Sequence, residues 1–436
     1  MDRLNLFPDT TTIENGSLSI AGCNLTNLAD LFGTPLYLYD HATLDNAVKA
    51  YQVALAELYP GPGCLTYAAK AFLCLALAEW TRQHDLWVDC SGLGEMAIAV
   101  AAGVPGERLL VHGVNKSTAQ LEEACRHAGV LVVDNLTELQ RVIDISHHRS
   151  TPDLWLRFQP GLAVETHAYT QTGQVGSKFG MDAAEILQAA QLCRAHALSL
   201  TGLHFHQGSQ FRDPAPLALG IERALELAQA IGFGSGWTLS PGGGWAVAYH
   251  EHELPSPDLN DYVQLVAGTL ERGCEARSLP LPCLRLEPGR SLVARAGVAL
   301  YRVGVVKRSA NRLWALLDGG LADNPRPALY GARYSALPVR APERRTKAPV
   351  WFAGPYCESG DVLIEALPFP EVREGDLLAV PVSGAYQLSM SSNYNGGCRP
   401  AVVWLDHGQA QLIQKRESVD DLLRRDQRLV KPDGTG

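Results

Sequence analysis

Short apolar runs alternate with segments of helical periodicity between residues 34 and 300, and this alternation constrains the fold more than any other feature of the chain. Strands are predicted at Leu36–Tyr39, Leu109–His112, Val130–Val133 and Leu154–Phe158, and helices at Ser117–Ala128 and Ala183–Ala195. Strands that alternate with helices favour an α/β fold with a parallel sheet, because each parallel connection returns through a crossover helix. A span of this length fits a (β/α)8 barrel, whose usual size is about 250 residues.

The pattern changes after residue 300, where short strands are separated by Gly, Pro and Asn turns. These strands are predicted at Val303–Lys307, Leu313–Leu317, Pro349–Phe352 and Ala401–Leu405. The pattern indicates a mainly antiparallel β domain over residues 301–436. Residues 1–33 are expected to complete this domain with a strand at Leu18–Ile20, and Lys415–Gly436 is expected to form a short helix with a frayed tail.

Composition narrows the class of protein. The 436-residue chain carries a net charge of −9, which disfavours nucleic-acid binding, and it has no run of about 18 apolar residues that would cross a membrane. No signal pattern follows Met1, and the ten cysteines are scattered without metal-ligand spacing. We therefore expect a cytoplasmic enzyme with reduced thiols and no metal site.

Two charged residues end predicted barrel strands, where side chains face the catalytic end of such a barrel. Lys70 ends the apolar run that begins at Thr66, and a partly desolvated lysine amine at such a place can form a Schiff base with a carbonyl group. Glu287 ends the run Leu284–Leu286. Taken alone, Lys70 is more simply a lysine at a strand end with its amine in water, and Glu287 a turn glutamate before a proline.

A glycine run at Gly242–Gly244 follows another predicted strand. Backbone N–H groups exposed by such a run can bind a phosphate, and the late position of the run fits the usual phosphate site of a barrel. Ser209 would add a hydroxyl to this site, and Arg290 offers a planar guanidinium to a phosphate or a carboxylate. Glycine runs also form ordinary turns, so the run is weak evidence by itself.

A second glycine motif, Gly92–Ala97, fits the loose G-x-G-x-x-A pattern of dinucleotide-binding proteins. Such a site also needs an acidic residue about 20 positions further on, at the end of the next strand. That strand ends at His112–Asn115, which contains no acid. The dinucleotide interpretation is therefore not favoured.

Five segments together resemble the diaminopimelate and ornithine decarboxylase family of pyridoxal 5'-phosphate (PLP) enzymes, which have fold type III. They are Thr66–Ala71, His206–Gln210, Gly242–Gly244, Glu287–Arg290 and Gly354–Ser359, in the order of the family. The resemblance implies PLP as cofactor and Lys70 as its Schiff-base lysine. It implies that Glu287 faces the ring nitrogen and keeps it protonated, so that the ring accepts electrons. It further implies these cofactor contacts: His206 on the ring face, Ser209, Gly243, Gly244, Gly289, Arg290 and Tyr386.

The resemblance also assigns a role to the motif Cys357-Glu358-Ser359. In the family this cysteine protonates the decarboxylated intermediate, and it reaches the active site from the other subunit of a homodimer. A thiol beside a carboxylate is chemically suited to deliver a proton. Without the family pattern, Cys357 would be interpreted as an ordinary thiol and Glu358 as a surface charge.

The segment Asn324–Tyr330 bears on the substrate. Arg326 and Tyr330 resemble the residues by which diaminopimelate decarboxylases hold the distal carboxylate, and Glu358 would meet the distal ammonium. Arg290 and Tyr386 are expected to contact the substrate too. The resemblance thus implies decarboxylation of meso-diaminopimelate to L-lysine. Asp318 and Asp323 lie close in sequence, so the interpretation as an ornithine or lysine decarboxylase is weakened but not excluded. Taken alone, Arg326 could be a solvated loop arginine.

Several positions depart from the family pattern. Ala69 and Phe72 flank the lysine where Val and Asn are usual, Val114 stands where Asn is common, and Gly396–Cys398 stands where the family often has Arg. These departures keep open a decarboxylase of another amino acid, including a modified or carrier-bound one. A racemase on the same barrel is disfavoured by Cys357 and Glu358, and a non-catalytic PLP-binding relative by the intact Lys70.

Overall fold

The computed structural model describes residues 2–161 and 176–429. The chain divides into two compact units, which are described separately below. The barrel unit contains Ala42–Ala296 and Gly384–Ser389, and the β unit contains Met1–His41, Gly297–Ser383 and Met390–Gly436.

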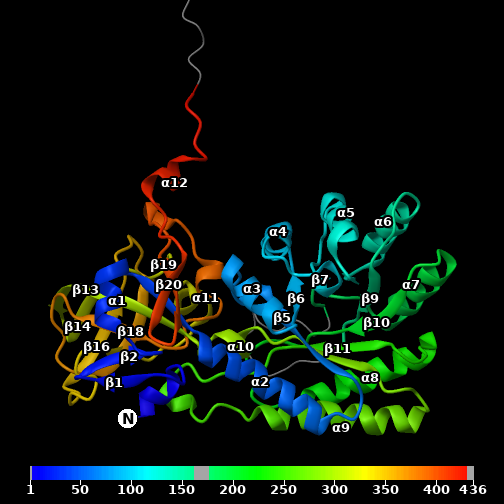
Figure 1. The fold of residues 1–436 in the computed structure, drawn as a ribbon, viewed down its shortest axis with the longest axis horizontal. Helices are drawn as coiled ribbons and strands as arrows, with labels where there is room; N and C mark the ends of the chain where they lie inside the picture. Colours follow the sequence, from blue (N-terminus) through cyan, green and yellow to red (C-terminus); the bar gives the residue numbers. More distant parts are fainter. Residues whose placement is uncertain (1, 162–175, 430–436) are drawn as a thin grey trace, which may run out of the picture. The chain divides into compact units, whose positions relative to one another are not determined.

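Eight parallel strands close into a barrel in the first unit, in the order β10-β11-β12-β5-β6-β7-β8-β9. The strands are β5 (Gly63–Ala68), β6 (Trp87–Cys90), β7 (Leu109–Val111), β8 (Val130–Val133), β9 (Asp153–Arg157), β10 (Leu200–His204), β11 (Thr238–Gly242) and β12 (Cys283–Leu286). Figure 1 shows helices arranged around these strands. The helices are α2 (His41–Leu58), α3 (Leu75–Gln83), α4 (Leu93–Ala101), α5 (Thr118–His127), α6 (Leu136–Ser146), α7 (Ala183–Ala195), α8 (Ala215–Ile231), α9 (Leu259–Arg277) and α10 (Arg290–Val293).

Local sequence explains these elements. All four residues of β8 are buried, as expected for a parallel strand that is covered on both faces. Helices α5 and α7 begin with capping boxes at Ser117 and Asp182, which satisfy backbone N–H groups of the first turn. Within the described ranges, no helix combines the length and the apolar composition that a bilayer crossing requires.

The β unit is built on a mixed sheet in which β17, β16, β14, β13, β4, β19 and β20 follow one another. Most of its neighbours are antiparallel, while β14 pairs with β16 and β4 with β19 in parallel. Its elements are β4 (Leu36–Asp40), β13 (Gly297–Ser309), β14 (Arg312–Leu317), α11 (Arg326–Tyr330), β15 (Leu337–Pro338), β16 (Ala348–Ala353), β17 (Val362–Phe369), β18 (Leu377–Val380), β19 (Ala401–Asp406), β20 (Gln409–Gln414) and α12 (Val419–Leu423). β18 joins the sheet beside β13, and the short β15 pairs with β18.

The predicted fold class is confirmed: the barrel is parallel and closed, and the second unit is mainly antiparallel. One element differs from expectation. The strand at Leu36–Tyr39 lies in the β unit, between β13 and β19, rather than in the alternating barrel pattern. The strand expected at Leu18–Ile20 is present in the β unit as β2 (Ser17–Ile20), where it forms a three-stranded sheet with β1 (Thr12–Glu14) and β3 (Cys23–Asn24). A helix, α1 (Leu25–Phe32), follows β3.

Candidate active site

Lys70 lies just beyond the carboxyl end of β5, in the 3₁₀ turn η2 (Ala69–Ala71). Its Nζ is 2.9 Å from Oδ2 of Asp89, which belongs to the neighbouring strand β6. The Lys70 side chain is 46% exposed whereas that of Asp89 is fully buried, so the amine is open to a small molecule while its partner is fixed. Desolvation opposes the charge on Lys70, but Asp89, followed by Tyr386 and Glu287, raises its pKa. The amine therefore has to lose a proton before it can act as a nucleophile.

Glu287 follows β12 and is buried beside a serine and two histidines. The Ser240 hydroxyl donates to its Oε1 over 2.6 Å, and the Nε2 atoms of His204 and His112 lie 3.2 and 3.4 Å from its Oε2. Burial alone would raise the pKa of Glu287, but the two histidines hold it well below its usual range. The barrel thus keeps a fixed negative charge at this position. The ligand atoms of Glu287, His112 and His204 also lie within 4.8 Å of one another, a spacing that a metal ion could use.

Arg290 connects residues from three parts of the barrel unit. It is buried at the start of α10, and its Nη2 donates to the Ser209 hydroxyl over 2.8 Å. Its Nη1 donates to the hydroxyl of Tyr249 over 2.6 Å. The guanidinium also lies 4.7 Å from the ring centre of Tyr386, whose backbone N–H donates to Ala71 beside Lys70. Arg290 therefore fixes the relative positions of a serine and a tyrosine that the sequence assigns to one site.

The glycine run and His206 lie next to each other. The Gly243 N–H donates to His206 Nδ1 over 3.4 Å. A Cβ added at Gly243 would lie 2.2 Å from the Glu287 carbonyl oxygen, and one at Gly244 would lie 2.1 Å from that of Gly208. Burial, followed by the charge of Lys70, lowers the pKa of His206 well below its usual value, so its imidazole is neutral at pH 7. Only glycine fits at these two positions, and the neutral ring beside them is suited to stacking.

Gly289 brings the Glu287 segment against the Lys70 segment. A Cβ at Gly289 would lie 3.0 Å from the Cβ of Ala68 and 3.1 Å from that of Ala71. The Ala68 N–H donates to the carbonyl of Pro288. A side chain at position 289 would push apart the two segments that carry the amine and the carboxylate.

The remaining predicted site residues lie in the β unit. Arg326 is buried at the start of α11, where its Nη1 donates to the Tyr334 hydroxyl. Tyr330 ends the same helix, and its hydroxyl donates to Met390 Sδ over 3.9 Å. Cys357 and Glu358 are exposed. The structure therefore brings the predicted residues together in two sets, one within each unit.

The comparison with known proteins agrees with this geometry. The family model "Pyridoxal-dependent decarboxylase, pyridoxal binding domain" matches residues 42–294, more than half of the chain. The chain belongs to the pyridoxal-dependent decarboxylase family.

Relatives of this family extend over the whole chain. The diaminopimelate decarboxylase of Actinosynnema pretiosum subsp. auranticum is 40% identical over 97% of this chain and 95% of its own length. That of Bacillus subtilis (strain 168) is 38% identical over 95% of this chain and 96% of its own. The crystal structure of diaminopimelate decarboxylase from M. jannaschii in complex with L-lysine superposes with a TM-score of 0.88 at 27% identity, covering 97% of this chain and 98% of that one.

The barrel cluster fits the cofactor of the pyridoxal-dependent decarboxylases. Lys70 offers an accessible amine, and Glu287 offers a buried carboxylate at the adjoining strand end. Gly243, Gly244 and Ser209 surround a place for a phosphate, where Arg290 Nε is a buried donor without a partner among the described residues. An amine, an anion and a phosphate-binding corner are the three groups that PLP requires.

Asp361 ties two segments of this decarboxylase together within the β unit. Its Oδ2 accepts the Tyr356 N–H over 2.9 Å, and its Oδ1 accepts the Leu321 N–H over 2.6 Å. The Gly354 N–H donates to its backbone carbonyl, and its own N–H donates to the carbonyl of Glu358. One buried carboxylate thus holds both the loop that carries Cys357 and the segment that leads to Arg326. Sequence analysis did not single out Asp361, although it directly follows the Cys-Glu-Ser-Gly motif.

The Asp361→Asn variant is expected to lower the free energy of unfolding by about 2 kcal/mol, because one of two buried N–H groups loses its charged acceptor. We expect kcat to fall about tenfold through misplacement of the Cys357 loop, with the cofactor absorbance unchanged. Chemical denaturation and steady-state kinetics measure the two effects. Glu365→Gln, at an exposed position of β17, is the matched control. If both variants behave alike, Asp361 does not position the loop.

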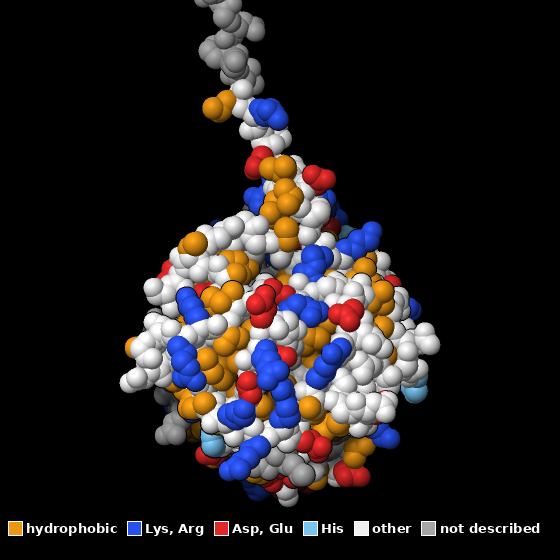
Figure 2. All heavy atoms as spheres, turned by 90° about the vertical axis from the view of Figure 1, so that its left-hand side faces the viewer, with side chains coloured by type: hydrophobic (Ala, Val, Ile, Leu, Met, Phe, Trp, Pro, Cys, Tyr) orange, Lys and Arg blue, Asp and Glu red, His pale blue; other side chains and the backbone are white. Residues whose placement is uncertain are grey.

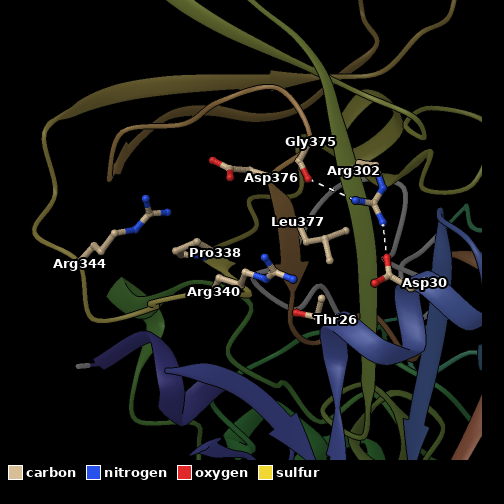
Figure 3. A pocket seen from close by; sticks show the side chains of 9 residues that line it. All are labelled: Thr26, Asp30, Arg302, Pro338, Arg340, Arg344, Gly375, Asp376 and Leu377. Atoms are coloured by element: carbon tan, nitrogen blue, oxygen red, sulfur yellow. Dashed lines mark hydrogen bonds and ion pairs between the residues drawn. The ribbon is translucent and has the colours of Figure 1, made fainter. Parts of the chain in front are cut away.

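A shallow hollow in the β unit contains none of the predicted site residues. Its lining residues are Thr26, Asp30, Arg302, Pro338, Arg340, Arg344, Gly375, Asp376 and Leu377 (Figure 3). Arg302 is committed to Asp30 and to the carbonyl of Gly375. Figure 2 shows basic side chains gathered among fewer carboxylates on the side of β13, β14 and β16. The exposed Arg340 and Arg344 contribute to solubility and surface charge, and their arrangement does not indicate a catalytic role.

Four partners in the site were missed by sequence analysis, namely Asp89, His112, His204 and Tyr249. Asp89, His112 and His204 lie at or just beyond the ends of strands β6, β7 and β10, so their place at a strand end was an available signal. β10 ends at His204, which faces Glu287, while His206 lies two residues further on and contacts Gly243.

Proposed function

We propose that this chain is a PLP-dependent diaminopimelate decarboxylase, which removes one carboxylate of meso-diaminopimelate as CO2 and yields L-lysine. The reaction class rests on one observation above all. Lys70 and Glu287 lie at the ends of adjacent strands, β5 and β12, with an accessible amine on one and a buried, ionised carboxylate on the other. The relatives that cover nearly the whole chain support the same substrate.

When bound, PLP supplies an electron-accepting ring for the pair released as the Cα–carboxylate bond breaks. Glu287 would hold a proton on the ring nitrogen, because its charge is fixed by Ser240 and the two histidines. His206 would cover one ring face as a neutral imidazole. Ser209, Gly243, Gly244 and Arg290 would bind the phosphate, and Lys70, held in place by Asp89, would carry the cofactor.

Cys357 would return a proton to Cα from a second copy of the chain. Its thiol is exposed, and its backbone N–H donates to Asn395 Oδ1 over 2.9 Å, so the loop is held while the side chain remains available. The departure at Gly396–Cys398 is adapted to this loop, because a Cβ at Gly397 would lie 2.9 Å from the Tyr356 hydroxyl. An active site completed by a partner requires a homodimer.

A mixture of two inactive variants tests the shared site. Lys70→Ala and Cys357→Ala are each expected to be inactive, and equal amounts mixed under subunit exchange should recover roughly a quarter of wild-type turnover. Half of the subunits then form mixed dimers in which one of two sites is intact. Mixing Lys70→Ala with Glu287→Gln is the control, because both lie in the barrel unit and no intact site can form. Equal recovery in both mixtures would contradict the shared site.

The distal end of the substrate would be held by Arg326 and Tyr330, with Glu358 near the distal ammonium. The two nearby aspartates are committed elsewhere, which argues against a purely cationic side chain such as that of ornithine. Asp323 is buried and accepts bonds from Tyr301, Tyr37 and the Gly320 N–H. Asp318 accepts bonds from Thr34 and from the Arg302 N–H.

CO2 release from meso-diaminopimelate, ornithine, arginine and lysine, measured side by side, tests the substrate. We expect turnover on diaminopimelate alone, and a loss of about 100-fold in its kcat/KM in Arg326→Met, because a carboxylate loses a charged partner. Arg333→Met, at an exposed position close by, should retain wild-type kinetics. Turnover on ornithine, or an unaffected Arg326→Met variant, would contradict the assignment.

A decarboxylase of another amino acid is the second candidate, and the departures near Lys70 favour it. Phe72 is buried where the family usually has a polar residue, and its carbonyl accepts the Tyr67 hydroxyl. A bound cofactor without turnover on any of the four amino acids would support this candidate.

A further inference from the structure

Two thiols meet at the end of the barrel opposite to the active site. Cys283 is the first residue of β12, and Cys64 is the second residue of its neighbour β5. Their Sγ atoms are 3.6 Å apart, close enough for one thiol to donate to the other. Both side chains are partly exposed, so a small reagent can reach them.

Strand register places the pair beside an arginine. Arg285 is the partner of Cys64 across the two strands, and side chains alternate along β12, so Cys283 and Arg285 lie on one face. The Arg285 guanidinium is held 3.5 Å from the ring centre of Trp87 and 5.2 Å from that of Trp155. A cation is thus fixed next to two thiols at the amino ends of the strands.

These surroundings shift the pKa values of the two thiols in opposite directions. The hydrogen bond from Cys64, supported by Arg285 against the effect of burial, lowers the pKa of Cys283 to about 7. The same hydrogen bond, followed by burial, raises the pKa of Cys64. The contact therefore favours loss of a proton from Cys283 rather than from Cys64. A reactive thiolate beside a second cysteine is the arrangement found where oxidation by peroxides is reversible.

We propose that Cys64 and Cys283 form a reversible disulfide when the protein meets a hydroperoxide. The Cys283 thiolate attacks one oxygen of hydrogen peroxide, giving a sulfenic acid on Cys283 and hydroxide. Cys64 then attacks the oxidised sulfur, its proton leaves with the hydroxyl as water, and the S–S bond forms. Overall, two thiols and one peroxide give one disulfide and two waters. A dithiol reductant reverses the change by taking up the disulfide itself.

The disulfide would join the two strands that carry the active-site residues at their other ends. Lys70 follows β5 and Glu287 follows β12, while Cys64 and Cys283 lie near the starts of the same strands. The two cysteines are 219 positions apart in sequence, so the bond would also constrain most of the barrel in the unfolded chain. Oxidation is therefore expected to stabilise the barrel without touching Lys70 or Glu287.

Peptide mapping of the wild-type holoenzyme tests the proposal directly. The protein is treated with hydrogen peroxide, alkylated under denaturing conditions and digested with trypsin. Residues 50–70 and 278–285 are tryptic peptides with Cys64 and Cys283 as their single cysteines. We expect them to be joined in one species about 2 Da lighter than their sum, lost after dithiothreitol, with a melting temperature several degrees higher before reduction.

Two variants separate this reaction from general oxidation. In Cys64→Ser, Cys283 should be over-oxidised to sulfinic acid, because no second thiol can resolve the sulfenic acid. Cys274→Ser, which removes a buried cysteine of α9, should leave the joined peptides unchanged. The proposal is overturned if Cys64 and Cys283 of the peroxide-treated wild type are alkylated as fully as in untreated protein.

Discussion

The Lys70→Ala variant is expected to lose the absorbance of covalently held cofactor and to retain less than about one thousandth of wild-type kcat. Lys70 is the accessible amine at the end of β5, so its removal takes away both the proposed attachment point and the cation beside Asp89. Absorbance spectra and single-turnover CO2 release measure the two losses.

A second substitution separates chemistry from folding. Alanine leaves the fully buried Asp89 without its cation, and this alone could destabilise the barrel. Lys70→Arg keeps a positive charge near Asp89 but has no nucleophilic amine. Both variants should therefore be inactive while only alanine loses stability, and Lys307→Ala, at an exposed lysine of β13, should match the wild type. Turnover near the wild-type rate in Lys70→Arg would contradict the assignment of Lys70 as the Schiff-base lysine.

The Glu287→Gln variant is expected to lose about 10²- to 10³-fold in kcat while still binding the cofactor. Glutamine preserves the shape of the side chain and the acceptor for Ser240. It removes the negative charge that would keep the ring nitrogen protonated. Kinetics and titration of the apoenzyme with PLP distinguish lost catalysis from lost binding. Glu287→Asp should recover part of the rate, and Glu226→Gln, at an exposed position of α8, should have no effect.

The charge of Glu287 also has a signature in the dependence of stability on pH. Because the folded state lowers its pKa, the carboxylate stabilises the fold above the pKa of the unfolded chain, and this contribution is lost as pH falls through the folded pKa. The difference in unfolding free energy between wild type and Glu287→Gln should stay constant above about pH 5 and shrink below it. A difference that grows towards acid pH would mean that Glu287 is protonated in the folded protein.

The parts of the site that follow from local sequence could be predicted, and the parts that depend on strand register could not. Lys70 and Glu287 each end an apolar run, and the closed barrel does bring them to adjacent strand ends. The contacts of Asp89 and His112 depend on which strands become neighbours, which no local pattern reveals. Asp361 is similar: its two N–H donors come from separate loops, and one of them is 40 residues away.

The fold shows the same division. The run Leu36–Tyr39 was correctly predicted as a strand, because short apolar runs rich in aromatic residues favour this state. Its position was not predictable, since every residue of β4 is buried and a strand covered on both faces suits a barrel and an open sheet equally. The long-range partners β13 and β19 decided its place.

The position of β4 has a consequence for the synthesis of the protein. β4 is paired on one side with β13 and on the other with β19, which begins at Ala401. At about 5–20 residues per second, a ribosome adds β19 tens of seconds after β4. Until then the apolar strand β4 has no partner on at least one edge. Newly made chains are thus expected to rely on chaperones, and interrupted translation should yield aggregating fragments even when the whole barrel has been made.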